Sequence, residues 1–331
     1  MTRSVHCRTR NMNENHHFLP VFYLKGFKGN NKKLTYFKKE YGSFRESAPA
    51  GIFYKPGLND VDLGEHGYID LENDFFREKD DRYAKSFIAI RDVYHYDLNA
   101  TPLQVKADVV EFVLGLYWRV PGGLQHVVDV IETEGLLNGS LELRNKETGE
   151  LYTDEDVPHI ISDIKNKIEN QKVFMTYFYE ENVLKHNWDK LNEKFFIYET
   201  TEPMLIGDIP YVPLKSENRL GFILDEFMIP LDQNHILIYA QKHPPFLETN
   251  VLYLFYQCII DGISEKIASS DKDYLKAMIE QSKTLHDRTS IIEKTMKKED
   301  ALVKFIELES QFDNFDAFAK YYSNLKKGIT K

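Results

Sequence analysis

The order of secondary-structure signals along the chain is the feature that most constrains its fold. Short segments rich in aromatic residues, at 33–38, 43–46 and 51–54, carry the glycine and proline punctuation that is typical of β-strands. Segments with helical periodicity follow, and a second β-rich section near 194–240 precedes further helices. Strands and helices therefore do not alternate one by one, as they do in a doubly wound parallel sheet. We predict an α+β fold that is mostly helical and has no regular doubly wound sheet.

The length and apolar content of the chain permit one large core. With 331 residues, of which 42% are hydrophobic and 13% aromatic, the chain can bury much area in a single domain. We expect residues 13–331 to form one α+β domain, with a sub-boundary near residue 192 where helical character gives way to β-rich character. Residues 1–12 have no apolar period and are expected to be a disordered extension, and Met12 is as good a start residue as Met1.

Net charge and cysteine content narrow the classes of partner and compartment. The formal net charge is −10, whereas a protein that coats duplex nucleic acid usually has a basic surplus. We therefore expect no broad duplex-binding surface, which leaves a small anionic or single-stranded nucleic-acid substrate in a local groove. The two cysteines, Cys7 and Cys258, form neither a disulfide framework nor a CxxC site, and no apolar stretch reaches about 18 residues. These features predict a cytoplasmic protein that does not associate with membranes.

Two adjacent histidines, His16 and His17, are the feature most like a functional site. They open the run His16-His17-Phe18-Leu19-Pro20, in which the proline suits the first turn of a short helix. Histidine changes its charge near neutral pH and is the commonest metal ligand in proteins. Neighbouring side chains on an extended segment point to opposite faces, so one histidine can ligate or catalyse while the other packs. The alternative is a structural role in which the ring bonds to the backbone.

Two glutamates on the predicted helix at 69–94 are candidate metal ligands. At about 100° per residue the apolar residues of this helix form one stripe, and Glu72 lies near its centre. Glu78 lies on the far side, four residues before Arg82. A carboxylate on a buried stripe is costly unless it is paired or bound to metal. Glu72 is therefore the stronger candidate, although its place in the first turn also suits a helix cap, and Glu78 is more typical of a surface ion pair.

Two further candidates lie at the ends of predicted elements. Arg119 ends the apolar helix at 103–120, where it either satisfies the last carbonyl groups of the helix or binds an anion such as phosphate. Asp208 follows a predicted strand and precedes Ile209-Pro210. That context suits a turn, which the aspartate side chain stabilises through its own bond to the backbone, and equally a site residue at a strand end.

These motifs, in this order, resemble a bacterial protein family catalogued only as domain of unknown function 4238. The resemblance covers roughly residues 15–260. Its opening is the run of two histidines, an aromatic residue, an apolar residue and a proline, and the later matches are Phe22-Tyr23-Leu24, Phe27, Glu72, Glu78, Arg119 with Pro121, Asp208 with Pro210, and Pro230-Leu231. The family pattern implies an asparagine before the proline that follows Asp208, where this chain has Ile209. The resemblance brings no established activity, so it implies which residues to test and not what they do.

We therefore expect a metal-assisted hydrolase, similar to a nuclease or phosphodiesterase, with histidine and carboxylate side chains around one cleft. The expected catalytic residues are His16, His17, Glu72, Arg119 and Asp208, and the expected ligands of a divalent metal ion are His16, His17, Glu72, Glu78 and Asp208. The ion would lower the pKa of bound water, and the arginine would neutralise charge in the transition state. The alternative is a non-catalytic binding or regulatory accessory protein with structural histidines.

Overall fold

The chain folds into helices and several small antiparallel sheets, as a computed structural model shows. The structure describes residues 14–62, 68–94, 100–120, 148–159, 183–215, 225–244, 249–261 and 265–289, with some single residues and pairs between them and beyond 300. Among these residues every strand pairing is antiparallel, so the α+β prediction is confirmed and no doubly wound sheet is present. The expected extension at 1–12 lies outside the described residues, and the single domain at 13–331 stays a prediction.

Two small ribbons organise the N-terminal part. β1 (Asn15–His17) pairs with β4 (Tyr54–Pro56). β5 (Asp60–Asp62) pairs with β6 (Tyr68–Asp70), which places Asp60 opposite Asp70. The second ribbon lies where the sequence predicts only a loop and the start of a helix, because strands of three residues are too short to show a period of two.

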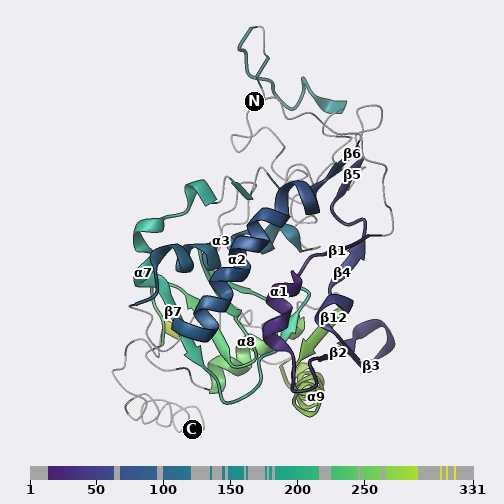
Figure 1. Cartoon of the computed structure of the whole chain (residues 1–331), viewed down its shortest axis with the longest axis vertical. Coiled ribbons are helices and arrows are strands. Elements are labelled where there is room, and N and C mark those ends of the chain that lie inside the picture. The colour runs from purple at the N-terminus through teal and green to yellow at the C-terminus, as the bar shows by residue number, and fades with distance from the viewer. Residues whose placement is uncertain are drawn as a thin grey trace.

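The helices α2 and α3 lie side by side next to these ribbons (Figure 1). α2 (Arg77–Ala89) is flanked by π-helical turns at Glu72–Phe76 and Ile90–Tyr94, so the prediction of a long helix is confirmed almost over its whole range. α3 (Leu103–Arg119) contacts α2 through aromatic residues. The rings of Phe87 and Phe112 meet edge to face with centroids 4.9 Å apart, which fixes the two helices against each other.

Two four-stranded sheets make up the β layers. One has the order β7 (Phe195–Glu199), β11 (His235–Tyr239), β10 (Glu226–Pro230) and β9 (Val212–Lys215). The other has the order β3 (Ser43–Ser47), β2 (Leu34–Lys38), β12 (Lys266–Ser269) and β8 (Ile206–Gly207). The first sheet confirms the predicted β-rich section near 194–240, and the second joins strands from the N-terminal part of the chain to β8 and β12.

The sequence at 247–269 predicts one continuous helix, and this prediction is wrong in its last part. α8 (Thr249–Asp261) ends early, and β12 lies in the middle of its sheet between β2 and β8. Ile267 and Ala268 are fully buried there. A short apolar run that is buried on both faces shows no strand period, so the pattern of the sequence did not separate strand from helix.

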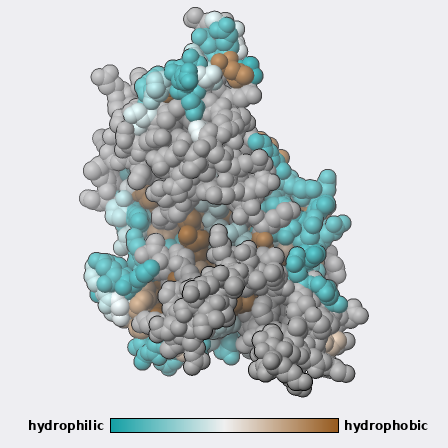
Figure 2. All heavy atoms as spheres, turned by 180° about the vertical axis from the view of Figure 1, so that it is seen from behind, coloured by the Kyte–Doolittle hydropathy of each residue, from teal (hydrophilic) through white to brown (hydrophobic). Residues whose placement is uncertain are grey.

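The elements enclose one buried apolar cluster. It includes residues of α1 (Val21–Leu24), of α2 and α3, and of both large sheets. α9 (Lys272–Thr289) packs on β2 and β12, and α8 contacts α9. On the face seen in Figure 2, the described residues at the periphery are mostly hydrophilic, and apolar residues gather toward the middle. None of the described helices is long and apolar enough to cross a membrane.

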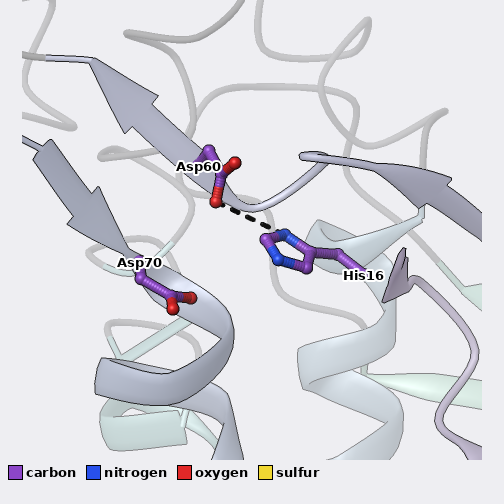
Figure 3. Close-up of side chains that lie close together, drawn as sticks. All are labelled: His16, Asp60 and Asp70. Carbon is purple, nitrogen blue, oxygen red and sulfur yellow. Dashed lines mark ion pairs between the residues drawn. The ribbon is translucent and has the colours of Figure 1, made fainter. Parts of the chain in front are cut away.

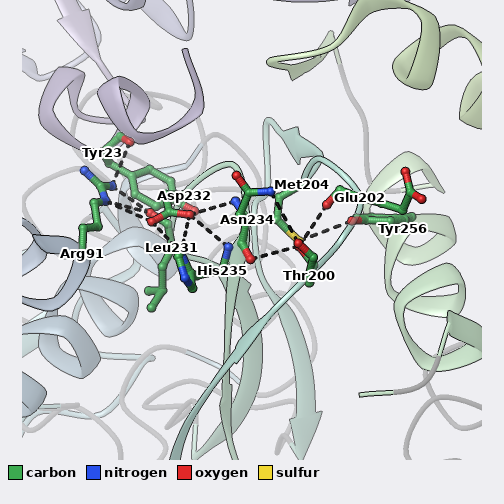
Figure 4. Close-up of polar contacts among 10 residues, drawn as sticks. All are labelled: Tyr23, Arg91, Thr200, Glu202, Met204, Leu231, Asp232, Asn234, His235 and Tyr256. Atoms are coloured by element: carbon green, nitrogen blue, oxygen red, sulfur yellow. Dashed lines mark hydrogen bonds and ion pairs between the residues drawn. The ribbon is translucent and has the colours of Figure 1, made fainter. Parts of the chain in front are cut away.

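A polar network fixes the turn between β10 and β11. The Asp232 carboxylate accepts the backbone N–H groups of Asn234 and His235 at 2.8 and 2.9 Å, and Nδ1 of His235 donates to it at 2.8 Å. Arg91, from the end of the α2 region, donates to the Leu231 carbonyl at 2.7 Å (Figure 4). The turn is therefore tied to the helical layer as well as to itself.

We expect the Asp232–His235 pair to stabilise the fold most in mildly acidic solution. The hydrogen bond to Asp232 raises the pKa of His235 above its ordinary 6.5, so the histidine contribution is complete below that value and is lost as pH rises through the raised pKa. Burial would raise the pKa of Asp232, but the bonds from His235 and Asn234 hold it below 3.8, so the aspartate contribution is lost only as pH falls through that lowered pKa. In urea denaturation, His235→Asn should therefore cost more at about pH 5.5 than at about pH 8.5. An equal cost at both values would contradict this account.

Candidate functional site

The paired histidines lie on β1, where they face opposite sides of the strand. His16 is 1% exposed, whereas His17 is only partly buried. The next residues are fixed by one carbonyl, since Phe53 O accepts the N–H groups of Phe18 and Leu19 at 3.1 and 3.5 Å. Phe53 has a φ of 58°, a left-handed conformation that is unfavourable for a bulky residue. The two hydrogen bonds compensate for this strain and hold the histidine segment in place.

His16 faces two aspartates that come from the second ribbon (Figure 3). Asp60 lies on β5 and Asp70 ends β6, and one ligand atom from each of the three residues lies within 4.8 Å of the others. Their exposed fractions are 1%, 1% and 7%. Nδ1 of His16 and Oδ1 of Asp60 are 3.7 Å apart. That distance is too long for a hydrogen bond, but it suits two ligands of one divalent ion, whose bonds to nitrogen and oxygen are about 2.0–2.2 Å long.

Hydrogen bonds orient this group. The backbone N–H of Asn59 donates to Nδ1 of His16 at 2.9 Å, so the ring hydrogen lies on Nε2 and an ion at Nδ1 would take the place of the N–H. Asp70 accepts the backbone and side-chain N–H groups of Asn73 at 3.1 and 2.6 Å, and thereby caps the following helix. Oδ1 of Asn59 is buried and has no hydrogen-bond partner in the described part of the chain. An unsatisfied oxygen beside the group is a position for a water or an ion.

Arg119 forms a second cluster next to the first. Its guanidinium donates to Asp80 at 2.8 and 2.9 Å and to Glu72 at 3.2 Å, while Nε donates to the His17 carbonyl at 3.0 Å. Asn59 links the two clusters, because its Nδ2 donates to Glu72 at 2.6 Å. Arg119 is 3% exposed, so both carboxylates neutralise a buried cation. The arginine therefore ties α3 to β1 and to the start of the α2 region.

Burial and the charges of this second cluster together shift the pKa values of the residues in and beside it. Burial opposes the charged form of Arg119, but Asp80 and Glu72 raise its pKa overall. Burial raises the pKa of Asp80 even though the arginine favours its ionised form. Burial also lowers the pKa of His17, whose Nε2 donates to the Ala50 carbonyl at 3.1 Å.

The structure does not bring all of the expected ligands together. Of the five, only His16 belongs to the group of three, and Glu72 is held by Arg119 and Asn59. Glu78 is exposed, and the predicted Glu78–Arg82 pair is wrong, because Arg82 extends to Glu111 on α3 at 2.6 Å. The roles expected for His17, Glu72 and Arg119 in catalysis stay predictions.

Asp208 forms hydrogen bonds with the backbone at the start of β12 in the second sheet. It is 1% exposed, and its Oδ2 accepts the backbone N–H groups of Glu265 and Lys266 at 2.5 and 2.9 Å. These bonds run to the start of β12 and not to the local turn that the sequence suggested, and the role of Asp208 in a site stays a prediction. Among the described residues Asp208 forms no group of metal-ligating side chains with His16.

We expect Asp208→Ala to lower the free energy of unfolding by about 2–3 kcal/mol, since hydrogen bonds to a charged group contribute about 1.5–3 kcal/mol and two buried N–H groups would lose their acceptor. Chemical denaturation followed by circular dichroism measures the change. Asp208→Asn is the matched control, because it keeps an acceptor oxygen and should lose less. A loss in the alanine variant no larger than in the asparagine variant would show that the two N–H groups do not depend on this carboxylate.

The sequence did not identify Asp60 and Asp70 as site residues. Asp70 had a recognisable signal, since an aspartate at the start of a helical run is typical of a helix cap, but that signal indicates a cap and not a ligand. Asp60 had none, because it lies in a polar segment that reads as a loop.

Comparison with known protein families places the chain beside one of unknown function. Residues 15–307 match the family described as Protein of unknown function (DUF4238), which covers most of the chain and extends beyond the residues over which the sequence resembles that family. No curated protein and no solved structure is similar to the chain at a significant level.

Proposed function

The chain belongs to the DUF4238 family of proteins of unknown function, and we propose from the geometry of its site that it is a metal-dependent hydrolase of phosphodiesters or similar anionic esters. The observation that carries the proposal is the buried group of His16, Asp60 and Asp70, whose ligand atoms lie within 4.8 Å of one another. None of the three is an exposed acid that merely faces solvent.

The electrostatics of this group favour a bound cation. Two carboxylates that are buried close together repel each other and lose their hydration, which is costly unless a cation compensates. In the described part of the chain Asp70 forms no ion pair with a lysine or arginine, and its hydrogen bonds come from Asn73. A divalent ion would compensate both charges at once. Mixed imidazole and carboxylate ligands suit Zn²⁺ and Mn²⁺.

The number of ligands favours catalysis over a purely structural ion. Three protein ligands leave one position open, which is the pattern of catalytic zinc sites, whereas structural sites are closed by four. When bound, such an ion supplies a water of lowered pKa and polarises a phosphoryl oxygen. Arg119 is already neutralised by Glu72 and Asp80, so we assign it the positioning of Glu72 and of the histidine strand.

The connection to the surface runs through Asn59 and Glu72. The Glu72 side chain is 25% exposed and bonds to Asn59, whose backbone N–H bonds to His16. His17, on the other side of the strand, is also partly exposed. We therefore expect the substrate to approach at this edge, and Glu72 to orient or accept a proton from a water there.

The test is metal binding and hydrolysis by the same protein. After treatment with EDTA and dialysis, the chain should bind Mn²⁺ or Zn²⁺ in isothermal titration calorimetry and should then hydrolyse bis(p-nitrophenyl) phosphate. His16→Ala should weaken metal binding by about 100-fold or more and abolish hydrolysis, since even residues that only support a ligand change affinity by about 10–100-fold. His17→Ala is the matched control and should keep metal binding. A chain that binds neither ion, or whose hydrolysis EDTA leaves unchanged, would rule out the proposal.

One observation favours a non-catalytic binding or regulatory protein as the second candidate. Both histidines bond to backbone groups, His16 to the Asn59 N–H and His17 to the Ala50 carbonyl, as structural histidines do. In that case His16→Ala would lower stability and the chain would bind no metal. The same calorimetric titration therefore separates the two functions.

A further inference from the structure

A cavity of about 490 Å³ lies between the end of β7 and the helices α8 and α9. None of its lining residues belongs to the His16 group or to the Arg119 cluster. Its volume falls in the range of about 300–1,000 Å³ that is usual for small-molecule sites. Its lining combines three tyrosines, Tyr253, Tyr256 and Tyr274, with two glutamates, Glu199 and Glu202.

The tyrosines supply aromatic surface. The rings of Tyr256 and Tyr274 are nearly perpendicular, at 77°, with centroids 6.1 Å apart. The hydroxyl of Tyr256 donates to the Pro203 carbonyl at 3.4 Å and contacts the Met204 sulfur at 3.3 Å. Tyr256 is thereby fixed in orientation, and the rings of Tyr253 and Tyr274 remain partly exposed. Fixed aromatic faces attract cations through the ring quadrupole.

The glutamates supply negative charge, of which His235, paired with Glu199 across the two strands, offsets a part. The residues that line the cavity include no lysine, arginine or histidine. Glu199 and Glu202 are exposed, and neither forms an ion pair within the described part of the chain. Their segment is held in place, because the Thr200 hydroxyl bonds to the carbonyls of Glu202 and Asn234 at 2.9 and 3.0 Å. Figure 4 shows Thr200 between Asn234 on one side and Glu202 and Tyr256 on the other.

We propose that this cavity binds a small organic cation that carries an ammonium group. Carboxylates at the rim would neutralise the charge, and the tyrosine faces would contact the apolar substituents of the ammonium, which is the combination that recognises such ligands. The charge of the rim disfavours anions, so the cavity is not a second site for the anionic ester. This inference is independent of the proposed hydrolase activity.

Choline is the probe, and 3,3-dimethylbutan-1-ol, which has the same shape without the charge, is the matched ligand. In calorimetric titration the full chain should bind choline at least about tenfold more tightly than the neutral alcohol. The double variant Glu199→Gln with Glu202→Gln should bind choline about tenfold or more weakly and should bind the alcohol as before. Glu193→Gln, an exposed change on the short helix α7 (Leu191–Lys194), is the control and should leave choline binding unchanged.

A variant that removes aromatic surface tests the second half of the proposal. Tyr274→Leu should weaken choline binding by about threefold or more, and thermal unfolding of each variant checks that it remains folded. Equal affinity for choline and the alcohol, or an unchanged affinity in the double glutamine variant, would overturn the proposal. So would the absence of binding by both choline and tetramethylammonium at about 10 mM.

Discussion

Replacement of Arg119 by alanine is expected to lower the free energy of unfolding by about 3 kcal/mol. The guanidinium is 3% exposed and bonds to Asp80, Glu72 and the His17 carbonyl, and it lies 4.4 Å from the centre of the Phe76 ring. Removal of one partner from a buried ion pair costs about 3–5 kcal/mol, because the remaining charge is left without compensation. The lower end applies here, since the Asp80 and Glu72 side chains are 20% and 25% exposed and regain some hydration.

Urea denaturation of matched variants measures this effect. Lys33→Ala removes a pair with Glu46 in which the side chains are 53% and 47% exposed, and it should cost no more than about 0.5 kcal/mol. Arg119→Lys keeps the charge but loses the planar set of donors, so its cost should lie between the two. If Arg119→Ala cost no more than Lys33→Ala, the arginine would not be the tie between α3, β1 and the α2 region that the geometry indicates.

The parts of the fold that the sequence predicted are the long segments in which apolar residues recur at a regular spacing. The helix at 69–94 was recognisable because Phe76, Tyr83, Phe87 and Ile90 recur on one face, and all four are buried. β12 was missed because Ile267, Ala268 and Ser269 are buried on both faces of the sheet, so no alternation marks this short strand. Which strands pair is a tertiary property: β2 and β12 are more than 200 residues apart in the sequence, and no local pattern records their register.

Of the three residues in the candidate site, the sequence predicted only His16. His16 stood out because the paired histidines precede an apolar run, yet its partners Asp60 and Asp70 meet it through a ribbon of two three-residue strands. The residue types that the sequence favoured were reasonable, but Asp208 was engaged by the backbone of β12. A carboxylate that caps an N–H and one that binds a metal look the same in a sequence, because both need the same acceptor oxygens.

The Asp60→Asn variant should have opposite consequences in the absence and in the presence of a divalent ion. Without metal, the substitution keeps the shape of the side chain and removes the repulsion between Asp60 and Asp70, so the free energy of unfolding should stay equal or rise. With Mn²⁺ at 100 times its dissociation constant, the wild-type chain should gain about 2.7 kcal/mol, because the ion binds the folded state. The variant, which lacks one of three charged ligands, should gain almost nothing.

Unfolding curves of both proteins with EDTA and with Mn²⁺ provide the four values needed, and His17→Ala should retain the full gain because His17 lies outside the group of three. The direction in which Asp60→Asn changes the free energy of unfolding in EDTA is informative by itself. If the group were only structural, the buried Asp60 carboxylate would hold its neighbours, His16 among them, by polar contacts of its own, and Asp60→Asn would then lower stability without metal. A loss in EDTA together with no gain from the ion in the wild type would therefore replace the metal centre by a buried histidine–aspartate contact.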